Sequence, residues 1–147
     1  MSVFDWQPLC FSSGVPPPSS QSYGQDLRDR AFIFACRVVE FCDGLYKRGG
    51  VGRILSPQLL RCATSIGANL EVARGGESRR DFISKCAIAL KEARESFFRL
   101  RLADRCQLGA KGEAAALAAE ASELAAIIGS IVRNTRRNAS KVANLTL

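Results

Sequence analysis

The chain has 147 residues, of which 47% are hydrophobic and 24% are charged, and its formal net charge is +7 at pH 7. That length and apolar content suit one folded domain with a substantial core. The sequence contains no histidine, which excludes Ser-His and Cys-His nucleophile pairs and removes the commonest metal ligand. The positive charge favours a polyanionic partner, with nucleic acid ahead of an anionic membrane surface.

Cysteine usage and hydropathy indicate a cytoplasmic protein. The six cysteines, at positions 10, 36, 42, 62, 86 and 106, form no CxxC motif, and four of them lie among apolar helical residues. We therefore expect free thiols in a reducing compartment. The first 24 residues carry no Lys or Arg, so a secretory signal is not expected. The apolar run Leu124–Val132 is too short to span a membrane, and we expect no membrane partner.

Residues 1–24 differ in composition from the rest of the chain. Three consecutive prolines, at positions 16 to 18, and the Ser-rich residues around them predict an irregular N-terminal tail. The apolar residues near its start leave a second possibility open, an arm that packs on the bundle or on a neighbouring subunit.

Two helices are predicted in the first half of the chain. The first covers residues 26–48 and stops at Gly49-Gly50. The second covers residues 57–75, with Ser56 as N-cap, Pro57 at the first helical position and Gly75-Gly76 at the end. Their apolar seams have spacings of three and four. The seam residues are Ala31, Phe34, Val38, Phe41 and Leu45, widened by Phe32, Val39 and Tyr46, and then Leu59, Ala63, Ile66, Leu70 and Ala73.

Two further helices are predicted at residues 79–107 and 111–137. Their seams are Phe82, Cys86, Ala89, Ala93, Phe97 and Leu100, then Leu117, Ala121, Leu124, Ile128 and Ile131. The third helix also has i,i+4 charge pairs, namely Asp81–Lys85, Lys91–Glu95 and Glu95–Arg99. Residues 139–147 are expected to fray. The predicted fold is all-α, an antiparallel up-down four-helix bundle over residues 25–138.

The second helix carries a polar pair, Ser65 and Asn69, beside its apolar seam. A polar side chain in a bundle interior costs stability unless it is hydrogen-bonded, but it fixes register. We expect a structural role, in which Asn69 bonds to a neighbouring helix and Gly67 permits close backbone approach. A small-molecule or metal site near Asn69 is the alternative.

Arginines are the candidate binding residues. In an up-down bundle, the turn after the second helix and the end of the fourth helix lie at the same end, so two basic clusters should meet there. The start of the third helix is also a natural anion site. The candidates are Arg74, Arg79, Arg80, Arg133, Arg136 and Arg137. Alternatively, these are solvated helix-end charges.

Catalysis is not expected. Thr64, Ser65 and the cysteines have no imidazole to activate them. The Gly-rich segment 49–53 follows a helix rather than a strand, so it lacks the context of a phosphate-binding loop. We therefore expect a protein that is not an enzyme and has neither a cofactor nor a metal.

Three segments resemble a known family. They are QLLRCATSIGANLEVA (58–73), SRRDFISKCAIALKEARE (78–95) and the FFRLRL that follows. The stretch is similar to four-helix-bundle proteins encoded within intervening sequences of bacterial 23S ribosomal RNA genes. The family pattern often reads Ser-Ile-Pro-Ala-Asn-Ile-Ala-Glu-Gly; here Gly67 replaces the proline, and Glu71-Val72 stands where Ala-Glu is usual.

The resemblance implies a four-helix bundle that assembles into a ring-like homopentamer. A related branch, the accessory variability determinants of diversity-generating retroelements, assists a reverse transcriptase and binds nucleic acid through basic surfaces. By that analogy, the six arginines would contact RNA or DNA. The alternative is a homo-oligomeric scaffold or protein-interaction ring with no direct nucleic-acid role.

Overall fold

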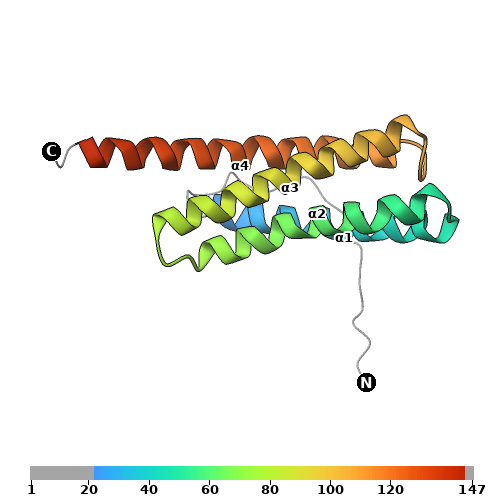
Figure 1. Cartoon of the computed structure of the whole chain (residues 1–147), viewed down its shortest axis with the longest axis horizontal. Coiled ribbons are helices and arrows are strands. Elements are labelled where there is room, and N and C mark those ends of the chain that lie inside the picture. Colours follow the sequence, from blue (N-terminus) through green and yellow to red (C-terminus); the bar gives the residue numbers. More distant parts are fainter. Residues whose placement is uncertain (1–21, 145–147) are drawn as a thin grey trace, which may run out of the picture.

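The computed structural model describes residues 22–144, which form four helices and no strand (Figure 1). The helices are α1 (Ser22–Arg48), α2 (Val51–Arg74), α3 (Arg79–Arg105) and α4 (Glu113–Asn144). Each helix runs antiparallel to the one before it and packs against it. The first and last helices, α1 and α4, also contact each other, but less extensively. The predicted all-α up-down bundle is confirmed. Most of the predicted tail, residues 1–21, lies outside the described residues, and α1 already begins at Ser22.

The core follows the predicted seams closely. Every predicted seam residue of α1 and α2 is buried, as are most of those in α3 and α4. The expected widening of the α1 seam is wrong, because Phe32, Val39 and Tyr46 are 64%, 46% and 52% exposed. These three residues are seven apart, so they form one stripe that lies too far around α1 to reach the core.

The start of α2 also differs from the prediction. The helix begins at Val51 rather than at Pro57, which lies inside it. Leu55, four residues before Leu59, is buried and extends the apolar seam by one turn. The Ser56 hydroxyl donates a 2.6 Å hydrogen bond to the Gly52 carbonyl, within the helix, instead of capping its start. Packing of the first turns of α2 in the core therefore outweighs the helix-start signal of Ser56-Pro57.

The other boundaries differ by a few residues. The third helix ends at Arg105, two residues earlier than predicted, and Gln107 has a left-handed φ of 53°. The fourth begins at Glu113 and continues to Asn144, so most of the predicted frayed segment is helical. In the turn between them, Gly109 packs on Phe41: a Cβ at Gly109 would lie 2.4 Å from the Phe41 ring.

The α4 segment Glu113–Ala139 is long and apolar enough, by length and composition alone, to cross a membrane. The shorter run Leu124–Val132 does not reveal this property, because the longer segment owes its hydropathy largely to alanines that lie outside the run. In the bundle, however, this helix places one face in the core against α3, as a core helix of a folded domain does.

Two glycines in α2 should respond oppositely to alanine. A Cβ at Gly52 would lie 2.4 Å from the Leu45 carbonyl oxygen, so we expect Gly52→Ala to lower the free energy of unfolding by about 1–3 kcal/mol. A Cβ at Gly67 would lie 3.9 Å from Ala31, an ordinary contact. Close packing therefore does not require glycine there, and Gly67→Ala should add up to about 1 kcal/mol through helix propensity. Urea unfolding of both variants measures these changes, and a destabilised Gly67→Ala would contradict this view of the α1–α2 contact.

Candidate nucleic-acid interface

The turn between α2 and α3 places three of the predicted arginines together. Arg74 ends α2, and Arg79 and Arg80 begin α3; all three are exposed. Ser78 caps α3, and its hydroxyl accepts a 3.1 Å hydrogen bond from the Asp81 backbone N–H. Since a side chain of the protein serves this amide and Asp81 adds a negative charge in the first turn, the helix start is a weaker anion site than predicted.

The other three arginines lie on the C-terminal part of α4. Spacings of three and four place Arg133, Arg136 and Arg137 on one face, and all three are exposed. Figure 1 shows α4 running past the α2–α3 turn, so the two clusters lie at the same end of the bundle. We call these six arginines the hinge-end cluster.

Most of the hinge-end cluster carries charge that no carboxylate balances. Within residues 27–139, Arg74, Arg79, Arg80, Arg133 and Arg137 form no ion pair with an acidic side chain. The Arg133 guanidinium donates to the Ser130 hydroxyl at 2.9 Å, a bond that leaves its charge in place. Glu77 and Asp81 flank the turn in sequence, whereas no acidic residue follows Glu123 in α4. The α4 arginines are therefore the stronger half of the cluster.

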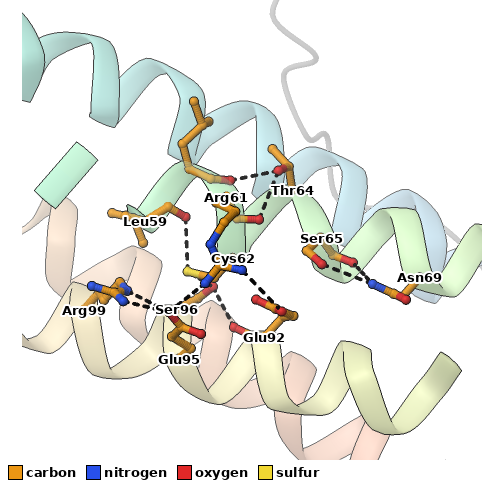
Figure 2. Close-up of polar contacts among 11 residues, drawn as sticks. Leu59, Arg61, Cys62, Thr64, Ser65, Asn69, Glu92, Glu95, Ser96 and Arg99 are labelled. Atoms are coloured by element: carbon orange, nitrogen blue, oxygen red, sulfur yellow. Dashed lines mark hydrogen bonds and ion pairs between the residues drawn. The ribbon is translucent and has the colours of Figure 1, made fainter. Parts of the chain in front are cut away.

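The structure gives the Ser65–Asn69 pair a local role. The Asn69 side-chain amide donates to the Ser65 backbone carbonyl at 2.8 Å and to the Ser65 hydroxyl at 3.1 Å (Figure 2). Among the described residues, Asn69 makes no hydrogen bond to another helix, so the predicted cross-helix bond is wrong. Both side chains are only half-buried, and the preceding turn of the same helix offers the nearest acceptor.

The polar contacts that join α2 to α3 lie further toward the middle of both helices (Figure 2). The buried Ser96 hydroxyl donates to the Glu92 carbonyl at 2.9 Å and lies 3.1 Å from the Cys62 sulfur. The Arg61 guanidinium contacts Glu95 at 3.0 Å and Glu92 at 3.6 Å. The sequence signal for this contact was the position of Ser96, which falls on the α3 seam between Ala93 and Leu100.

The Glu95 carboxylate receives two arginines from different helices. Its Oε1 lies 2.7 Å from a guanidinium nitrogen of Arg99, and Arg61 approaches it from α2. The hydrogen bond from Arg99, together with both positive charges, lowers the pKa of Glu95 below its ordinary value of 4.5. Of the three predicted i,i+4 pairs in α3, Glu95–Arg99 is the one found in the structure.

Three cysteines are buried in the core. Burial raises the pKa values of the Cys42, Cys62 and Cys86 thiols, and that of Cys42 reaches about 12. Because the thiolate is the reactive form, these groups are poor nucleophiles at neutral pH. Cys36, Cys42, Cys62, Cys86 and Cys106 are all free thiols, and no cluster of three or more Cys, Asp or Glu ligands occurs within the described part of the chain.

Comparison with known proteins identifies a family with this fold. The family model described as 23S rRNA-intervening sequence protein matches residues 25–130. The chain belongs to this family. A solved structure of a protein of unknown function from the S23 ribosomal protein family of Bacteroides thetaiotaomicron is 33% identical, with a TM-score of 0.68, over 75% of this chain and 97% of that one. No curated protein matches the chain.

The range matched by the 23S rRNA-intervening sequence protein family divides the hinge-end cluster. It includes the arginines of the α2–α3 turn and stops before Arg133. The stronger, α4 half of the cluster therefore lies in a part of this chain outside the family match.

Reasoning from the sequence named Arg80 as a candidate but missed the other four cations of one exposed group. Apolar spacing identified the inward face of α3, but the same four-three spacing also occurs on its outward face. That outward stripe contains Arg80, Lys91, Arg94, Arg101 and Arg105, with Phe98 among them. Applying the periodicity test to charged residues would have revealed it.

The buried thiols predict a loss of stability in alkali. The ordinary thiol pKa is 9.0, and in the folded protein the value for Cys42 is about 12. The unfolded chain therefore releases its protons first, so this contribution is intact below about pH 9 and declines as the pH rises toward 12. We expect the urea midpoint to fall between about pH 9 and 10.5, and to fall less in Cys42→Ala than in the wild type. Equal losses in both proteins would show that the Cys42 thiol is not responsible.

Proposed function

We propose that this protein is a non-catalytic, oligomeric nucleic-acid-binding protein of the cytoplasm. The observation that carries the proposal is the hinge-end cluster, in which five exposed arginines have no carboxylate partner among the described residues. A net charge of +7 adds a general attraction for polyanions. Arginine guanidinium groups suit phosphate because they present several donors in a planar fork.

The proposed role beside a reverse transcriptase rests on analogy, through the resemblance to the accessory variability determinants. Under this proposal, the bundle holds RNA or DNA while a reverse transcriptase acts on it, and the protein itself performs no chemistry. The absence of histidine and the raised thiol pKa values of the buried cysteines support the second part of this proposal, that the protein itself performs no chemistry. Co-purification of a reverse transcriptase that survives nuclease treatment would support this role, and recovery of unrelated proteins alone would count against it.

An exposed apolar stripe on α1 supports self-association. Phe32, Val39 and Tyr46 lie seven residues apart on one outward face, and Ile54 of α2 is also 68% exposed. Apolar stripes with this repeat pack well against another helix, and a second copy of the chain offers the same stripe. The resemblance suggests that the assembly is a homopentamer.

The same stripe favours a second candidate function, a homo-oligomeric scaffold or protein-interaction ring. In that case the arginines only keep the assembly soluble, and nucleic acid has no part in its action. The two candidates differ in one measurable property, which is affinity for nucleic acid at low salt.

Removing charge from the α4 arginines should weaken nucleic-acid binding. We expect Arg133→Gln/Arg136→Gln/Arg137→Gln to lower affinity and to reduce the slope of log K against log salt by about 0.7–0.9 per lost phosphate contact. Fluorescence anisotropy with labelled RNA and DNA over a salt series measures both quantities. A charge-matched control, Arg37→Gln/Lys47→Gln/Lys111→Gln, also removes three exposed cations.

A control variant that loses as much affinity as the α4 variant would show that net charge, rather than the hinge-end cluster, causes binding. Absence of binding by the wild-type protein at low salt would overturn the proposal and leave the scaffold.

Placing a charge in the α1 stripe should disrupt the oligomer. We expect Val39→Lys to shift the protein toward monomer, because burying an unpaired ammonium at an interface is costly. Sedimentation velocity at micromolar concentration checks the result. Val72→Lys is a matched control, since Val72 is 54% exposed on α2 and lies outside the stripe. Monomeric wild-type protein at this concentration would contradict the oligomer itself.

A further inference from the structure

The outward face of α3 carries a stripe of exposed positive charge, in which Ser84 and Ala87 separate Arg80 from the other cations. Positions 80, 84, 87, 91, 94, 98, 101 and 105 alternate spacings of four and three, so they lie along one side of the helix. At a rise of 1.5 Å per residue, the stripe is about 37 Å long. Five of its eight residues are exposed cations and none is acidic. We call it the α3 track; its cations are Arg80, Lys91, Arg94, Arg101 and Arg105.

Two of the four carboxylates of α3 are held away from the track, while Asp81 and Asp104 lie beside its two ends. Glu92 and Glu95 face α2, where Arg61 and Arg99 hold them. Within the described residues, none of the five track cations forms an ion pair with an acidic side chain. The Arg101 guanidinium lies over the Phe97 ring, 5.4 Å from its centre, a contact that orients the side chain and keeps its charge.

An aromatic ring interrupts the track near its C-terminal end. Phe98 is 64% exposed, and Leu102, one turn further along, is 44% exposed. Together with Arg101 and Arg105 they line an open hollow of about 450 Å³, in which Asp104 is the one acidic lining residue. A flat apolar ring flanked by guanidinium groups offers both a stacking surface and phosphate contacts.

We propose that the α3 track binds single-stranded RNA, with phosphates along the cations and a base stacked on Phe98. A single row of charge with one exposed ring matches a strand whose bases are accessible, because duplex bases are already stacked on one another. The neighbours α2 and α4 pack against α3, so its outward face is the part that a ligand can reach. We expect the single strand to be RNA rather than DNA, because RNA loops and ends present unpaired bases.

This inference rests on the proposed nucleic-acid function and specifies its ligand. Arg80 belongs both to the hinge-end cluster and to the start of the α3 track, so one strand can pass from the end of the bundle along its side. The hinge-end cluster supplies charge alone, whereas the track adds a stacking surface and therefore a preference for unpaired bases.

The decisive experiment varies the ring and retains the charge. A labelled oligo(U) of about 12 nucleotides, within the range of about 4–16 for single-strand sites, is titrated with wild-type protein, Phe98→Leu and Phe98→Tyr. We expect Phe98→Leu to bind about 5- to 150-fold more weakly, as the loss of one stacked base implies, and Phe98→Tyr to bind normally. Val72→Ala shortens an exposed apolar side chain on α2, outside both the track and the α1 stripe, and should bind as the wild type does. A duplex of the same length should bind equally well to wild-type protein and Phe98→Leu.

The outcomes separate this inference from the proposed function. Unchanged oligo(U) affinity in Phe98→Leu, together with weaker binding by the α4 arginine variant, overturns the track and leaves nucleic-acid binding at the hinge end. Loss of affinity in Phe98→Leu but not in the α4 variant supports the track and overturns the hinge-end site. No binding of any nucleic acid at low salt overturns both. Tighter binding of oligo(dT) than of oligo(U) overturns the assignment to RNA.

Discussion

The packing of α2 against α3 depends on small side chains at the point where the two helices meet. Ala63 on α2 and Ala89 and Ala93 on α3 are fully buried, and the Ser96 hydroxyl lies 3.1 Å from the Cys62 sulfur. Larger residues at these positions would destabilise the bundle, because interiors are packed too densely to absorb added methylenes. The polar Ser96–Cys62 contact also favours one register, since a slip would leave the hydroxyl facing apolar atoms. Because side chains repeat regularly around a helix, this inner contact also determines which α3 residues face outward.

That register explains how the charges divide between the two sides of α3. The carboxylates of Glu92 and Glu95 lie on the edge that faces α2, where Arg61 bridges them. Because Glu95 is held by Arg61 and Arg99, Lys91 is not drawn into the i,i+4 pair that its spacing allows. Two of the four carboxylates of α3 are therefore paired at the edge that faces α2, while the cations remain on the outward face. Each exposed ion pair contributes little stability, about 0–1 kcal/mol, but the arrangement determines which charge reaches solvent.

The sequence predicted the fold well because the buried faces of all four helices repeat at spacings of three and four. Predictions failed where tertiary contacts overrode a local signal. Ser56-Pro57 is a good helix start in isolation, yet burial of Leu55 and the fit of Gly52 against Leu45 extend α2 backward. Asn69 satisfies its amide within its own helix, a choice that periodicity cannot foresee, because spacing gives a side chain's direction but not its nearest acceptor.

The candidate site was predictable only in part, for a related reason. Up-down topology was enough to place the α2–α3 turn and the end of α4 at one end of the bundle. The number of cations there does not measure the field they create, since Asp81 and Glu77 offset part of the charge at the turn. The cations on the outward face of α3 are spread over 26 positions of sequence, so they form no obvious cluster, but the helix aligns them in one row with acidic residues only beside its ends. A flexible polyanion can follow such a line, because successive phosphates can each find a partner along the helix. The connection at Arg80 therefore makes the end of the bundle and the side of α3 one surface, whose use depends on a ligand long enough to span both.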